Sequence, residues 1–206
     1  MKKIEAIVGL DLSLTSAGVA RWPITEPDPK TLTVGIPPEF GSDMERYVES
    51  VTQLFNLIGK NDVVFMENYS YGSASNAVMA GELGGIVKFM ILRKTGLTPI
   101  WVSPNTLKKF VLGAGKGQDK NKVILGAYKK WGIECDTDDE IDAYALCMLG
   151  KQLLHFDKPA YKYEIECNET VTLGSLENRK KKKKDRNANL PVLNRCYEIL
   201  ANKGSL

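Results

Sequence analysis

Residues 7–20 read IVGLDLSLTSAGVA and place a single acid, Asp11, between two apolar runs. The apolar residues around it predict a buried strand over 4–12, and the Ser/Thr/Gly turn leads into a second strand over 17–24. A buried carboxylate is unfavourable unless a partner or a cation compensates its charge. This stretch therefore predicts that Asp11 has a partner, a bound cation or a role in chemistry.

The periodicity of the remaining sequence predicts further elements. We expect strands over 30–36, 62–67 and 98–103, and helices over 43–58, 75–95, 104–112, 120–131, 137–154 and 190–202. Three consecutive strands favour an antiparallel meander, and the later alternation of helix and strand favours parallel additions. The sequence thus predicts an α/β fold with a mixed five-stranded sheet flanked by helices. Alternating apolar residues over 161–173 predict one more strand or a hairpin.

The chain has 206 residues, enough for one domain and a small appendage. Its character changes after Pro159, so we expect a catalytic domain of residues 1–157 and a C-terminal extension of residues 158–206. Within the extension, RKKKKKDRNAN (179–189) has too few apolar residues to pack and predicts a flexible basic loop. Such a lysine run favours a polyanionic partner, although a solvated surface is an equally good explanation.

Composition excludes several kinds of site. The only histidine is His155, and the four cysteines are widely spaced without a CxxC pair. This argues against Ser-His-Asp catalysis, histidine-rich metal sites and structural zinc. We expect no membrane association and a reducing cytoplasm, because no apolar run is long enough for a span and the amino terminus does not resemble a signal peptide. Any hydrolytic chemistry must then use carboxylates, lysines or hard metal ions.

Four acids lie where apolar elements begin or end. Asp11 lies in the first strand, Glu67 ends the strand 62–67, and Asp139 and Asp142 share one face at the start of the last long helix. If the first and fourth strands are parallel neighbours, the first two acids share a crevice that a helix start could complete. Four such carboxylates need cations, and two Mg²⁺ or Mn²⁺ ions about 4 Å apart form a phosphodiester cleavage site.

Each acid also has a simpler explanation to be weighed. Thr137 and Glu140 fit a capping box, so helix capping alone would account for acids at that helix start. Glu67 by itself could be an ordinary surface acid at a strand end. Asp11 is harder to explain in this way because its neighbours are apolar: Gly9, Leu10, Leu12 and Leu14.

Four motifs occur in a fixed order: GLDLSLTSAGVA, FMEN, SPNTLKKFVLGAGKGQDKNKV and DEIDAYAL. In these motifs, over residues 4–154, the chain resembles the RuvC-type Holliday junction resolvases of the ribonuclease H-like superfamily. The resemblance implies a ribonuclease H-like fold and a Mg²⁺- or Mn²⁺-dependent endonuclease, with two ions per site, that resolves four-way DNA junctions as a homodimer. It implies catalytic metal ligands at Asp11, Glu67, Asp139 and Asp142. The lysine-rich tail resembles bacteriophage members, which act in the host cytoplasm.

The same resemblance assigns residues around the acids. It places Lys108 and Lys120 near the scissile phosphate, with Lys120 stabilising transition-state charge. Because the loop 113–120 is one residue longer than expected, that role could pass to Lys116 or Lys122. Lysines predicted to bind DNA are Lys108, Lys109, Lys116 and Lys122.

Two further features carry implied roles. Tyr69 and Tyr71 match an aromatic that inserts at the junction, although ordinary loop tyrosines are an equally good explanation. The apolar stripe of residues 79–91 matches the dimer helix, with core packing as the alternative.

Three other functions fit parts of the sequence. A broader structure-selective nuclease would act on flaps or Y-junctions, and the sequence does not distinguish it. A non-catalytic DNA-binding module would use the lysines of 179–184 for counterion release. An actin-like ATPase would share the opening G-x-D-x-S motif, but we find no second phosphate loop.

Overall fold

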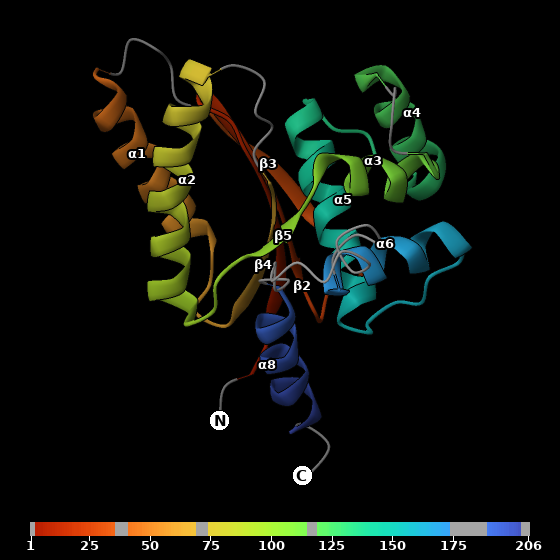
Figure 1. Ribbon diagram of the computed structural model, residues 1–206. Helices are drawn as coiled ribbons and strands as arrows, with labels where there is room; N and C mark the ends of the chain where they lie inside the picture. The colour runs from red at the N-terminus through yellow and green to blue at the C-terminus, as the bar shows by residue number, and fades with distance from the viewer. Residues whose placement is uncertain (1–2, 36–40, 69–73, 115–118, 174–188, 203–206) are drawn as a thin grey trace.

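The computed structural model describes residues 3–35, 41–68, 74–114, 119–173 and 189–202. Its centre is a five-stranded sheet of order β3-β2-β1-β4-β5 (Figure 1). The strands are β1 (Ala6–Leu12), β2 (Ser16–Pro23), β3 (Lys30–Gly35), β4 (Asp62–Glu67) and β5 (Ile100–Val102). The first three strands form an antiparallel meander, and β4 and β5 add parallel to β1. The predicted mixed sheet is confirmed.

Helices cover both faces of the sheet (Figure 1). They are α1 (Asp43–Leu57), α2 (Ala74–Thr95), α3 (Pro104–Leu112), α4 (Lys120–Trp131), α5 (Asp138–Leu153), α6 (Lys162–Leu173) and α8 (Asn189–Ala201). The pair α1 and α2 lies on one face, whereas α5 lies against β1 and β2 on the other and contacts α3, α4 and α6.

No helix in the described part of the chain combines the length and apolarity that a membrane crossing requires.

The strands divide their side chains between two cores. Val8 and Leu10 of β1 pack into the core under α1 and α2, whereas Ile7 packs into the core under α5. Successive residues of a strand point to opposite faces, so Asp11 lies on the α5 face. The same alternation in β4 places Glu67 on that face, two residues after Phe65 of the α5 core.

Two glycines let α5 lie directly on the sheet. A Cβ at Gly9 would lie 1.9 Å from the backbone oxygen of Ala143, and a Cβ at Gly18 would lie 1.9 Å from that of Asp139. Neither distance is possible for two nonbonded atoms, so any other residue would push the helix away. The close approach brings the first turn of α5 next to the ends of β1 and β2.

The strand or hairpin predicted over 161–173 is wrong, because residues 162–173 form helix α6. The alternating apolar residues also contain a helical stripe, in which Glu164, Cys167 and Val171 are buried at spacings of three and four. Ile165 and Leu173, which the strand would have buried, are each 47% exposed. Packing of the helical stripe against α3 therefore outweighs the period-two pattern.

The apolar stripe of residues 79–91 belongs mainly to the core. Leu83, Val87, Met90 and Ile91 are buried among side chains of the sheet and α1, which favours the core-packing alternative. Other apolar side chains of these two helices are exposed instead. We call them the apolar α1–α2 surface: Met44, Val48, Phe55, Val78, Phe89 and Leu92.

Candidate active site

The predicted acids meet at the carboxyl ends of β1 and β4. The parallel register ends with the pair Leu10 and Met66, so Asp11 and Glu67 follow it side by side on neighbouring strands. Asp139 and Asp142 reach the same place from the start of α5. All four line one cavity of about 290 Å³, together with Pro104, Lys108, Lys120, Val123, Ile124, Asp138 and Ile141.

The start of α5 is fixed by a helix cap. The Thr137 hydroxyl accepts a hydrogen bond from the backbone N–H of Glu140 at 3.2 Å. The Glu140 carboxylate accepts from Thr33 of β3 at 2.7 Å, instead of closing a capping box. Helix capping and a role in the cavity therefore do not exclude each other for this segment, because the cap holds the acids in place.

The same sheet contains a second buried acid, which has a partner. The fully buried carboxylate of Asp62, at the start of β4, accepts two hydrogen bonds from the Arg21 guanidinium at 2.8 and 3.0 Å. In the described part of the chain, no basic side chain forms an ion pair with Asp11 or Glu67. The two acids at the cavity thus lack the direct ion pair that compensates Asp62, and the charges of Lys120 and Lys108 offset their burial only in part.

Burial and mutual repulsion perturb these acids strongly. Burial, followed by the charges of Asp142 and Asp139, raises the pKa of Asp11 to about 8. Burial and the Asp11 charge raise the pKa of Glu67 to about 9. Burial and the Asp138 charge raise the pKa of Asp142 to about 6. The cavity therefore favours either protons or a cation at these oxygens.

Two polar contacts orient acids at the rim. The Ser16 hydroxyl donates to Oδ2 of Asp139 at 2.5 Å. Lys120 forms an ion pair with Asp138, and this hydrogen bond lowers the pKa of that carboxyl and raises the pKa of the lysine. Neither Asp138 nor Ser16 was predicted as a site residue, although TDDEID does place an acid at each of the first three positions of α5.

The other predicted residues lie in several places. Lys108 and Lys120 both line the cavity. Lys109 instead forms an ion pair with Glu166 of α6, with Nζ to Oε2 at 2.5 Å. The backbone N–H of Lys122 donates to the N-cap residue of α4, and its side chain does not line the cavity. Outside the described residues lie Lys116, Tyr69, Tyr71 and the lysine run 179–184.

The donor chemistry of the cavity fits a hard divalent cation, because it offers only carboxylate oxygens. The carboxylates that line the cavity do not point toward one shared position. Among the described residues, no three Asp, Glu, His or Cys groups are arranged to hold a metal ion. Asp139 is turned toward Ser16 and Asp138 toward Lys120. The residue types therefore suit a divalent metal ion, and their side chains would have to reorient to coordinate it.

No protein-family model matches this sequence, and no curated protein sequence matches it. Solved structures do match the fold. RuvC from Thermus thermophilus in complex with a Holliday junction substrate superimposes with a TM-score of 0.58 at 18% identity, covering 70% of this chain and 91% of that one. This chain has a RuvC-type resolvase fold. A further Thermus thermophilus RuvC structure gives a TM-score of 0.56 at 18% identity, covering 69% of this chain and 91% of RuvC.

Proposed function

We propose that this chain is a divalent-metal-dependent endonuclease that cleaves branched DNA, with the four-way junction as its principal substrate. The observation that carries the proposal is that carboxylates from three separate segments and two lysines line one cavity. The RuvC-type fold supports it, because one structure with this fold is a complex with a Holliday junction substrate.

We assign distinct roles to the acids and the lysines. Asp11, Glu67, Asp139 and Asp142 are the proposed ligands, and a bound Mg²⁺ or Mn²⁺ would activate water and stabilise the leaving oxygen. Lys108 and Lys120 provide positive charge opposite the acids, where a DNA phosphate would approach. When a phosphate binds, Lys120 exchanges its pairing with Asp138 for the phosphate and so becomes available to stabilise developing charge.

Resolution of a junction requires two cuts on opposing strands, and we propose a homodimer that brings two such cavities to one substrate. The apolar α1–α2 surface supports this, because two helices in contact with each other both expose large apolar side chains. A bacteriophage origin, a cytoplasmic location and DNA contacts by residues 179–184 stay predictions from the sequence.

The decisive experiment uses labelled four-way junctions with Mg²⁺. Asp11→Asn should reduce nicking by at least about 100-fold, because it removes a metal ligand, while junction affinity measured in Ca²⁺ stays within about threefold. Glu198→Gln is the matched control, since Glu198 is an exposed acid on α8. Normal nicking by Asp11→Asn would show that the assigned site is wrong.

Substrate choice is tested with the same protein. A four-way junction, a flap, a Y-junction and a linear duplex should be cleaved in decreasing order, with the duplex uncut. Equal cleavage of junction and flap would indicate the broader structure-selective nuclease. Binding of all branched substrates without cleavage in Mg²⁺ or Mn²⁺ would indicate a non-catalytic DNA-binding module.

Metal binding has a readout independent of activity. Mn²⁺ should raise the melting temperature of the wild-type chain, because a ligand that binds only the folded state stabilises it. Glu67→Gln should remove most of this rise by deleting one ligand. The Glu198→Gln control should show the wild-type rise.

A further inference from the structure

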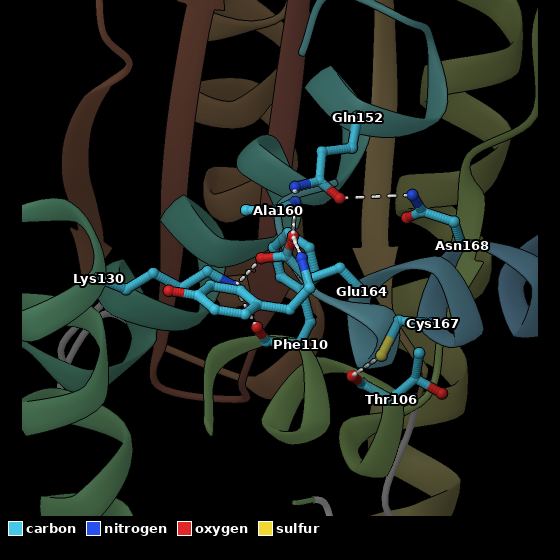
Figure 2. A network of polar contacts seen from close by, with 9 residues as sticks. Thr106, Phe110, Lys130, Gln152, Ala160, Glu164, Cys167 and Asn168 are labelled. Atoms are coloured by element: carbon cyan, nitrogen blue, oxygen red, sulfur yellow. Dashed lines mark hydrogen bonds and ion pairs between the residues drawn. The ribbon is translucent and has the colours of Figure 1, made fainter. Parts of the chain in front are cut away.

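A buried polar network joins the C-terminal extension to the catalytic domain (Figure 2). Its centre is Glu164 of α6, whose side chain is only 1% exposed. One carboxylate oxygen accepts from Lys130 Nζ of α4 at 2.5 Å. The other accepts from the backbone N–H of Ala160 at 2.6 Å and from Gln152 of α5 at 3.2 Å. Glu164 therefore connects three helices.

Lys130 extends this connection to a fourth helix. Its ammonium also donates to the backbone oxygen of Phe110, in the last turn of α3, and lies 4.1 Å from the centre of the Phe110 ring. Carbonyls in the last turn of a helix lack intrahelical donors, and a cation there complements the helix dipole. One ammonium thus fixes the C-terminal end of α4 against the C-terminal end of α3.

Helix α6 contacts α3 along its length. The Cys167 thiol donates to the backbone oxygen of Thr106 at 3.6 Å, and Glu166 pairs with Lys109. The two helices that α6 and Lys130 hold together, α3 and α4, carry the cavity lysines Lys108 and Lys120.

Burial of the Lys130–Glu164 ion pair costs desolvation free energy, so stability alone does not explain the pair. Burial alone would raise the pKa of Glu164, but hydrogen bonds from Lys130 and Ala160 outweigh burial and hold that pKa below its usual range. The Glu164 carboxylate is therefore ionised at neutral pH. Buried ion pairs can often be replaced by uncharged residues of similar volume without loss of stability, whereas charge-assisted hydrogen bonds fix the relative orientation of the groups that they join.

We propose that the Lys130–Glu164 pair is a positioning contact through which α6 holds α3 and α4, and with them Lys108 and Lys120, over the acidic cavity. This inference rests on the proposed nuclease function. It gives the C-terminal extension a defined task in catalysis, carried out from outside the cavity.

The test uses the full chain carrying Lys130→Met and Glu164→Gln together. Gln keeps an acceptor for the Ala160 N–H, and the double change leaves no unpaired buried charge. Glu198→Gln is the matched control, because it makes the same substitution at an exposed acid of the C-terminal extension, on α8. Glu164→Gln alone serves as the second variant if the double variant does not fold. Three quantities are measured: amide hydrogen exchange, single-turnover cleavage and junction affinity in Ca²⁺.

We expect the double variant to raise amide exchange in α3 and α4 by about tenfold or more, while β1 and β4 exchange as in the wild type. The cleavage rate of the bound complex should fall about tenfold or more, with affinity within about threefold, which is the signature of misplaced groups and not of lost binding. The Glu198→Gln control should change none of these quantities.

Two contrary results are distinguishable. Unchanged exchange, or raised exchange with a wild-type cleavage rate, overturns the positioning role. A wild-type chain that cleaves no branched DNA, combined with raised exchange in the double variant, overturns the proposed function while the link between α6 and the two helices stands.

Discussion

Gly18 of β2 lies so close to α5 that a Cβ there would be 1.9 Å from the backbone oxygen of Asp139. Gly18 is also the sheet partner of Asp11 in the antiparallel register of β1 and β2. One residue without a side chain therefore sets the separation between the acid on the strand and the acids on the helix.

Gly18→Ala should displace the first turn of α5 from the sheet. Overpacking of this kind costs about 1–3 kcal/mol of unfolding free energy. Cleavage should fall more than stability alone explains, because the displacement also moves Asp139 and Asp142 away from Asp11. Denaturant unfolding and single-turnover cleavage at matched folded fractions measure the two effects. Gly35→Ala is the control, since a Cβ there would meet no atom within 4 Å; equal effects of both variants would contradict the prediction.

Asp11→Asn should stabilise the chain in the presence of a chelator, increasingly so as the pH rises. The pKa of Asp11 is about 8 in the fold against an ordinary value of 3.8, so the folded state binds more protons than the unfolded state between these values. Stability of the wild type therefore falls as pH rises through this window, and the neutral Asn removes that loss.

Thermal melts of Asp11→Asn and wild type at several pH values, with chelator present, check this sign. The melting temperature of the variant should exceed that of wild type by little near pH 4, by more up to about pH 8, and by a constant amount above that. Asp62→Asn provides the contrast, because it removes an acceptor from Arg21 and should destabilise the fold. An advantage for Asp11→Asn that shrinks as pH rises would contradict the account.

Lys120→Gln should lower the single-turnover cleavage rate by about 10- to 100-fold, because it removes a positive charge that faces the phosphate. The slope of log affinity against log salt should become less steep by about one, as for the loss of one phosphate contact. Lys129→Gln is the control, since Lys129 lies on the same helix outside the cavity lining. If Lys120→Gln cleaves at the wild-type rate, the role belongs to another lysine of this loop.

Phe89→Lys should convert a dimer to a monomer, since it places a charge on the apolar α1–α2 surface, where Phe89 is 66% exposed. Light scattering coupled to gel filtration measures the mass. The variant should nick single strands of a junction without coordinating the second cut. Ile165→Lys, an equally polar change at an exposed site on α6, should leave the mass unchanged. A wild-type chain that is already monomeric would remove the basis of the dimer proposal.

The sequence predicted the sheet well because local rules determine it, and the same rules place the acids. Alternation along β1 and β4 fixes which face Asp11 and Glu67 occupy, and the helix cap at Thr137 fixes where α5 begins. The failures come from contacts between distant segments. The period-two pattern of residues 161–173 did not show that α3 would bury a helical stripe, and nothing near Lys109 signalled its pairing with Glu166.

Strand β4 begins with Asp62, which pairs with Arg21, and ends five residues later with Glu67 in the cavity. At about 3.3 Å per residue the Cα atoms of the two acids lie roughly 17 Å apart, and the alternation along the strand places their side chains on opposite faces of the sheet. The ion pair that secures the strand is thereby separated from the proposed site. If that site is correct, substitutions around Glu67 that alter substrate preference should leave the contact between Asp62 and Arg21 intact.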